Sequence, residues 1–465
     1  MAKLRVYQFG GVKQKLSPFL HEDGDLLVCE NLDNYPTGAK TKRSGYEKFL
    51  GTLPSTVSSL FVYPNPSNSN ITYYANSGSI LYHSLQGTGA WTISGSGTFS
   101  GQRPVGYGAM GTVLMAGDGS VTRHSTNGTS FTDTTLAPAG NKFAEFRQRM
   151  FIADGTTLYA SELGSPTGWS LSTTNPSYSE PIDGYGVIGA IFSVNDEVVV
   201  TKTGGQITHF DGYRKYVSPS NDAPGFFNSV AKLDGVIFYV NPEGACGFAT
   251  ERQKISDAIQ PLFYNNTGSY PSSEFLRSLA QGVAFNDNYY CYIGTTTSDI
   301  YPQTISNCIV KYDMPRNEWS WYKIPTRIYS ALYDYTEDGY GWMFGGNGQV
   351  YRFNPTVTSD DGQAISAQMI GFLHFKEPDR DKRINRIIAT ASPGCGATFQ
   401  IAMTDTISLD SLQWIDIGDL YTGTRKFAPD VELRGRFMFY RLYESSTDKP
   451  FTFYGFTVDF DYVGE

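Results

Sequence analysis

Few side chains in this sequence have the type and spacing that metal or thiol chemistry requires. The histidines are dispersed and form neither an H-x-x-x-H nor an H-E-x-x-H motif, so no zinc site is expected: His21, His83, His124, His209 and His374. The cysteines are scattered, odd in number and without a C-x-x-C pair: Cys29, Cys246, Cys291, Cys308 and Cys395. This usage favours buried free thiols in a reducing compartment over a disulfide framework. We expect neither a metal nor a cofactor.

Motifs for covalent or phosphate chemistry are missing as well. The sequence has no G-x-S-x-G elbow and no G-x-x-x-x-G-K-[ST] loop. The Gly-rich stretch 345–348 lies between two expected strands, so it is interpreted as a hairpin turn. Arginines that could line an anion pocket are present, but no spacing selects them: Arg103, Arg123, Arg147, Arg149 and Arg214. Paired carboxylates stay open, because a sequence gives no separations. We predict a protein that is not an enzyme and has no catalytic residues.

The elements that would position any site follow one repeat between about Val57 and Phe353. Its clearest copy, Val187–Phe210, reads as an apolar strand, an Asn-Asp turn, a second strand, a Gly-Gly turn and a third strand ending in an aromatic residue. The copies start at Val57, Val105, Phe143, Val187, Val230, Val283 and Ala331. A repeat of roughly 40 to 50 residues is typical of four-stranded propeller blades. We predict an all-β fold whose β-propeller has about seven blades, with six or eight as alternatives.

The composition agrees with a turn-rich and aromatic-rich β protein. The chain contains 49 Gly, 32 Tyr and 30 Phe, and only 17% of its residues are charged. Helix signals are scarce, and the best candidate is the short stretch 273–280. The aromatic residues have two interpretations: packing within and between blades, or an exposed platform for sugar rings or a partner protein.

The rest of the chain divides around the repeat. Residues 1–50 are predicted to be an N-terminal extended segment that makes assembly contacts, 51–356 the propeller, and 357–465 a C-terminal β-sandwich, because strict alternation returns after 357. The irregular stretches 253–271 and 295–307 are expected to be projecting loops, where partners commonly bind.

Charge limits the possible partners. A formal net charge of −9 argues against gripping nucleic acid through its phosphates, although a surface past which DNA slides stays open. The densest basic cluster is Lys40, Lys42 and Arg43. It is either a solvated loop or guarded edge strand, or a contact with an acidic partner. We expect no signal peptide and no membrane span, since no apolar run approaches the roughly 18 residues that a span needs.

Several features follow one another in the opening segment: Gly10-Gly11, Pro18, Asn31-Leu32 and Lys42-Arg43-Ser44-Gly45-Tyr46. This order resembles the beginning of tail hub or nozzle proteins of short-tailed bacteriophages. The sequence departs from that pattern where Asn31 is not followed by Val or Trp, and where Ser44 separates Arg43 from Gly45. The stretches 435–442 and 450–456 are similar to the last strands of that family.

The resemblance implies a structural virion protein, made in the host cytoplasm and located in the tail. Six copies would form a ring below the portal and adaptor proteins and extend the DNA-ejection channel. The ring would anchor fibres, spikes or a plug such as a needle, while DNA crosses its lumen without specific binding and this chain inserts into no membrane. A closed ring needs two different patches on each subunit, which we place on the N-terminal segment and the sandwich. The candidate assembly contacts are Lys40, Lys42, Arg43, Arg436 and Arg441.

A second function class stays open. The stretch 125–131 is similar to a degenerate Asp-box turn of sialidase propellers, a turn that is structural and indicates only the fold. Because propellers also include enzymes and binding proteins for sugars, the alternative function is a carbohydrate-binding or glycan-hydrolysing propeller, either sialidase-like or a glycosidase. Such a protein should have an aromatic-rimmed axial pocket with converging carboxylates or arginines. A ring subunit should have a plugged axis and lateral interfaces well above roughly 1,000 Å².

Overall fold

The computed structural model shows an all-β protein. The residues it describes are 2–14, 20–35, 38–66, 70–85, 89–95, 98–101, 104–194, 196–217, 227–241, 244–249, 252–263, 280–298, 304–335, 341–375, 377–410, 412–430, 432–447 and 449–463. Two short 3₁₀ segments lie entirely within these ranges: η2 (Phe227–Ser229) and η3 (Asp257–Leu262). No helix in this part of the chain is long and apolar enough to cross a bilayer.

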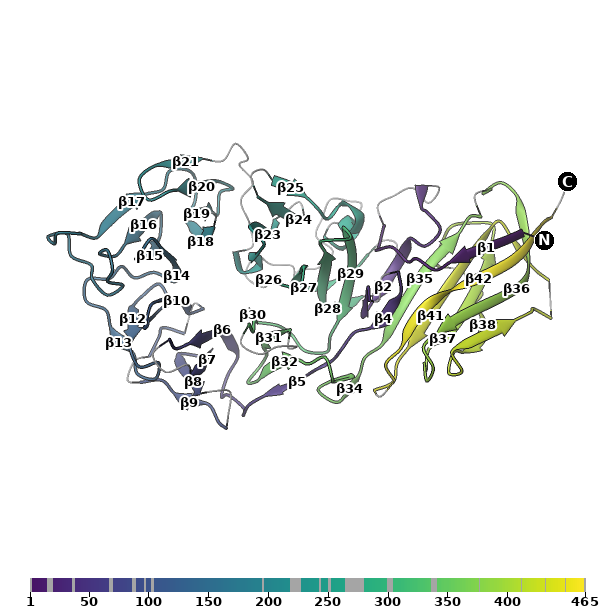
Figure 1. Ribbon diagram of the computed structural model, residues 1–465, viewed down its shortest axis with the longest axis horizontal. Coiled ribbons are helices and arrows are strands. Elements are labelled where there is room, and N and C mark those ends of the chain that lie inside the picture. The colour runs from purple at the N-terminus through teal and green to yellow at the C-terminus, as the bar shows by residue number, and fades with distance from the viewer. Residues whose placement is uncertain are drawn as a thin grey trace.

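A circle of four-stranded antiparallel units forms the larger part of the molecule (Figure 1). In the described ranges, six units are built from four consecutive strands each: β6 (Val57–Pro64), β7 (Ile71–Ser77), β8 (Ile80–Leu85) and β9 (Thr92–Ile93); β10 (Gly106–Met110), β11 (Val113–Gly117), β12 (Thr122–Ser125) and β13 (Thr132–Asp133); β14 (Lys142–Phe146), β15 (Arg149–Asp154), β16 (Thr157–Ala160) and β17 (Tyr178–Pro181); β18 (Ile188–Val194), β19 (Glu197–Lys202), β20 (Ile207–Phe210) and β21 (Lys215–Val217); β22 (Ala231–Leu233), β23 (Val236–Asn241), β24 (Gly244–Phe248) and β25 (Arg252–Lys254); and β26 (Gln281–Phe285), β27 (Asn288–Thr296), β28 (Ile305–Asp313) and β29 (Glu318–Lys323).

One further unit closes the circle with strands from two distant parts of the chain. It consists of β30 (Ser330–Tyr333), β31 (Trp342–Gly345), β32 (Val350–Phe353) and β5 (Tyr46–Phe49). β5 pairs antiparallel with β32, and β30 packs against β6 of the first unit. The innermost strand of each unit begins within two residues of the start expected for its repeat. The predicted propeller is therefore confirmed.

Two-residue hairpins explain why the inner strands turn so tightly. β14 and β15 are joined through Arg147 and Gln148, and β26 and β27 through Asn286 and Asp287. All four residues have positive φ, between 46° and 60°. A turn with φ > 0 at both central positions matches the right-handed twist of the flanking strands, so it keeps the two strands paired to their ends.

A β-sandwich follows the propeller (Figure 1). One sheet contains seven strands: β1 (Ala2–Val6), β3 (Leu32–Asp33), β4 (Lys40–Lys42), β36 (Asp381–Ala391), β39 (Thr424–Phe427), β40 (Leu433–Gly435) and β42 (Thr452–Val463). The other sheet contributes β35 (Ala367–Leu373), β37 (Thr398–Thr404), β38 (Ile415–Asp419) and β41 (Phe437–Glu444). Aromatic rings fill the space between them; Tyr440 and Phe456 lie 4.8 Å apart, and Phe399 and Phe453 5.5 Å apart. Burying such rings is a large source of stability.

The propeller and the sandwich share one continuous sheet. Strand β2 (Leu26–Glu30) pairs antiparallel with β35 of the sandwich and, through Glu30 and Trp321, parallel with β29 of the propeller. The result is a nine-stranded sheet that runs from β26 to β38. All five residues of β2 are buried. The two domains are therefore joined by hydrogen-bonded backbone as well as by side chains.

Residues 1–50 do not form the separate extended segment that the sequence suggests. They give β1, β3 and β4 to the sandwich, β2 to the shared sheet and β5 to the propeller. The physical reason is that these short strands have unpaired backbone groups, which larger sheets pair. All of them except β4 (Lys-Thr-Lys) also contribute apolar side chains that the larger sheets bury.

Two other expectations concern segments that are only partly described. The helix candidate 273–280 lies outside the described residues except for Ala280, which is buried. In the stretch 253–271, η3 is not a projecting loop, because Ile259 and Leu262 are buried in the main core. Residues 299–303 of the other expected loop also lie outside the described ranges.

Candidate functional site at the domain junction

The basic cluster near residue 40 lies inside the molecule. Lys40, Lys42 and Arg43 are 0%, 5% and 2% exposed, respectively. Lys40 and Lys42 are two residues apart on β4, so both side chains point to the same face of the strand. That face looks into the junction between the propeller, the sandwich and the N-terminal strands.

Each of these three cations meets an acceptor of its own chain. The Arg43 guanidinium donates two hydrogen bonds to the Asp360 carboxylate, at 2.8 and 2.6 Å. Lys42 Nζ donates to the Glu444 carboxylate. Lys40 Nζ donates to Asn34 Oδ1 and lies 3.9 Å from Glu318 Oε2. Bidentate pairing of this kind is the strongest geometry available to a buried arginine.

Three of the predicted assembly contacts are therefore wrong. Lys40, Lys42 and Arg43 cannot reach a partner, because leaving their acceptors would strand buried charges on both sides. Arg441 is half-buried, with its guanidinium over the Tyr443 ring at 4.8 Å. Arg436 is exposed, so of these five residues it is the one whose charge faces solvent.

The residues that hold the cluster were not identified from the sequence. Asn31 has a φ of 57° and accepts a hydrogen bond from Arg43 Nε at 2.8 Å. Its side chain also accepts from Lys323 N at 3.0 Å and donates to Ser366 O at 2.7 Å. Asparagine is one of the few residues that tolerate positive φ, and this is the only local signal that the position carried.

A second row of pairs extends the junction into the propeller. The Asp33 carboxylate accepts hydrogen bonds from Lys311 Nζ on β28 and from the Tyr322 hydroxyl on β29. Burial, helped by the nearby Asp33 charge, raises the pKa of Tyr322 well above its usual range. The hydroxyl thus stays protonated and acts as a donor to Asp33.

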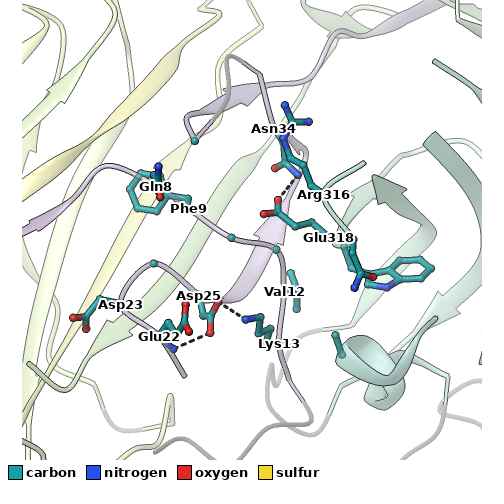
Figure 2. Close-up of a pocket in the computed structure, with 17 residues that line it drawn as sticks. Gln8, Phe9, Val12, Lys13, Glu22, Asp23, Asp25, Asn34, Arg316 and Glu318 are labelled. Carbon is teal, nitrogen blue, oxygen red and sulfur yellow. Dashed lines mark hydrogen bonds and ion pairs between the residues drawn. The ribbon is translucent and has the colours of Figure 1, made fainter. Parts of the chain in front are cut away.

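A cleft of about 600 Å³ lies beside the buried pairs (Figure 2). Of its four acidic side chains, Asp25 pairs with Lys13 at 2.8 Å, and Glu318 accepts from Asn34 at 2.7 Å. Burial raises the pKa of Glu318. Gly11 is required in the wall, since a Cβ there would stand 2.6 Å from Trp319 N. Among the described residues, no group of three His, Cys, Asp or Glu side chains could hold a metal.

The propeller axis contains a cavity of about 560 Å³. It is lined by the first residues of inner strands from several blades, such as Ser58, Lys142 and Gln281. The described lining includes no Asp, Glu, Arg or His. The plugged axis that is expected of a ring subunit is therefore not observed among the described residues. The described lining of the cavity also lacks the converging carboxylates or arginines that are expected of a sialidase-like site.

The Asp-box-like turn has a structural role. It connects β12 and β13, where Asn127 Oδ1 accepts hydrogen bonds from the backbone N–H groups of Thr129 and Ser130, both at 2.9 Å. Ser125 Oγ accepts from Gly128 N at 3.0 Å. These bonds satisfy backbone N–H groups of the turn, which joins the last two strands of its blade.

A small aromatic pocket of about 190 Å³ opens between the last two blades. Its lining includes Phe285, Tyr290, Trp342 and Phe353, with Asp33 at the polar side. Phe285 stacks between Tyr290 and Tyr333, with centroid distances of 5.2 and 5.5 Å. The pocket combines apolar ring edges with one fixed carboxylate.

Known proteins that are similar to this chain are found among solved structures. No family model and no curated protein matches the sequence. Among solved structures, the WD40 β-propeller domain of Doa1 is similar over 66% of this chain and 96% of that one, with 12% identity and a TM-score of 0.41. BamB from Moraxella catarrhalis covers 76% of this chain and 96% of its own, with 11% identity and a TM-score of 0.42.

The extracellular domain of the putative one component system BT4673 from B. thetaiotaomicron is similar over 88% of this chain and 59% of that chain. Its identity is 10% and its TM-score 0.46.

We expect Arg43→Met to lower the free energy of unfolding by about 3–5 kcal/mol, because Asp360 is left buried without its partner. The double variant Arg43→Met/Asp360→Leu should recover a large part of this loss. Urea titration of both single variants and the double variant measures the coupling free energy between Arg43 and Asp360. If the losses of unfolding free energy in the two single variants simply add in the double variant, a direct Arg43–Asp360 pair is contradicted. The control is Lys48→Ala, whose side chain is exposed on β5.

A pH effect is expected from Lys382. This side chain is fully buried and donates to the carbonyl oxygens of Glu377 and Arg436. Burial lowers its pKa from 10.5 to about 8. Between pH 8 and 10.5 the unfolded chain binds the proton and the folded chain does not, so stability should rise with pH in that window. Lys382→Met should remove this rise in stability. The measurement is the difference between the urea midpoint of the unmodified protein and that of the variant at each pH.

Proposed function

We propose that this chain is a structural subunit of a bacteriophage tail hub or nozzle ring. The ring extends the DNA-ejection channel below the portal and adaptor proteins and anchors fibres, spikes or a plug. It is built from six copies, and the DNA crosses its lumen without specific contacts. The subunit works in the virion tail as a mechanical element and carries out no reaction.

The observation that carries this proposal is the joining of the propeller to the sandwich. A nine-stranded sheet and buried ion pairs such as Arg43–Asp360 connect the two domains. A ring subunit under load needs domains that keep their relative positions, whereas an enzyme that closes on a substrate needs a hinge. The resemblance of the opening and closing segments to tail hub proteins adds an independent reason.

The charge of the chain also suits this role. With a net charge of −9, the chain has little tendency to hold the phosphates of passing DNA.

We expect the purified chain to form closed rings with a lumen as its concentration rises. Multi-angle light scattering should give a mass that is an integral multiple of the monomer, and negative-stain electron microscopy should show the ring. Addition of a portal–adaptor complex should stabilise it. A chain that stays monomeric at every concentration, with and without that complex, would overturn the proposal.

Carbohydrate binding is the second candidate, and the aromatic pocket between the last two blades is the observation that favours it. Aromatic rings beside a carboxylate are the usual means of holding a sugar ring. Saturation-transfer NMR with methyl glycosides of glucose, galactose and N-acetylglucosamine should then show transfer that Phe285→Ala abolishes. Tyr213→Ala, an exposed tyrosine on another blade, is the matched control. No transfer from the unmodified protein would eliminate this candidate.

A further inference from the structure

The seven-stranded sheet of the sandwich has one face in the core and one in solvent. On β42, Phe456, Val458 and Phe460 point into the core, so the residues between them point outward. The register of the neighbouring strands extends this assignment across the sheet. The outward side chains include six cations: Lys3, Arg5, Arg383, Arg386, Lys426 and Arg434.

These cations come together from four strands. In the register, Lys3 of β1 and Arg386 of β36 both lie opposite Asp459 of β42. Arg383 of β36 lies opposite Arg434 of β40. The side chains of Arg383, Arg386 and Arg434 are 48%, 50% and 49% exposed, so the charge is available at the surface.

The outward face of the seven-stranded sheet has a net positive charge, although the chain as a whole has a net negative charge. Three acids share it, Asp381, Asp459 and Asp461, and each forms an ion pair with one of the arginines. Six cations and three anions leave this face with three positive charges. Because the whole chain carries −9, the rest of the chain carries −12. This face therefore has the opposite sign to the net charge of the rest of the chain.

Exposed tyrosines border the cations. Tyr7 and Tyr454 are 44% and 42% exposed, and the Tyr7 hydroxyl lies 3.0 Å from Thr457 Oγ1 on the same outward face. Tyrosine and arginine are enriched in protein interfaces and dominate their binding energy, because both offer a large contact area with polar ends. We call this set of outward residues the tyrosine–arginine face.

We infer that the tyrosine–arginine face docks onto the acidic surface of a second copy of this chain. A positive face and a negative remainder on one subunit permit head-to-tail contacts, in which two different patches meet. Charge complementarity of this kind accelerates association and excludes face-to-face pairing, where like charges meet. The inference rests on the proposed function in that it names one lateral surface of the ring.

The test uses light scattering of the full-length chain at several salt concentrations. Lys3→Glu/Arg5→Glu is the central variant, because neither residue forms an ion pair with any described residue. We expect its association to weaken at least about tenfold at low salt and to lose its salt dependence. Arg214→Glu/Lys449→Glu reverses the same number of exposed charges outside the face and should associate normally.

A second variant separates charge from contact area. Tyr454→Ser should weaken association at every salt concentration while leaving the slope of affinity against salt unchanged. Normal assembly of both Lys3→Glu/Arg5→Glu and Tyr454→Ser would overturn this inference and leave the proposed ring standing. An equal loss of association in Arg214→Glu/Lys449→Glu would also overturn it, since reversing any exposed charge would then weaken association. If the unmodified chain does not associate under any of these conditions, the proposed ring function is itself contradicted.

Discussion

A charge that is buried must be neutralised by its own chain, and the junction of this protein is built on that constraint. Arg43 is enclosed by Asp360, Asn31 and the rings of Tyr322 and Phe353. Its partners come from the N-terminal strands, the last blade and the segment that enters the sandwich. Because a stranded charge costs several kcal/mol, only one arrangement of these parts is tolerated. The pairs thus contribute specificity of architecture more than net stability.

The regular parts of the fold were predictable from the sequence. Blade starts at Val57 and Val187 follow from local alternation and turn chemistry, which act over a few residues. The role of β5 was not predictable, because its partner β32 lies about 300 residues further on. The four residues of that strand carry no information about which distant sheet edge they will complete.

The basic cluster shows why sites are harder to predict than strands. Lys40 and Lys42 lie on one face of a short strand, and the sequence cannot say whether that face meets water or acids 300 to 400 residues away. The opposite error occurs on the sandwich. Lys3, Arg386 and Arg434 lie far from one another in the sequence, yet strand pairing assembles them into one surface. Of the predicted assembly residues, only Arg436 remains exposed.

The position of β5 also decides when the propeller can be completed during synthesis. β5 leaves the ribosome early, whereas β32, its partner, follows roughly 300 residues later, about half a minute at ordinary elongation rates. During that time the blades exist as an open arc whose two ends are unpaired sheet edges. Cells must keep such edges from joining those of other chains. Completion of the propeller is therefore the capture of an early strand by a late one, and protection of the nascent arc becomes a requirement for high yield.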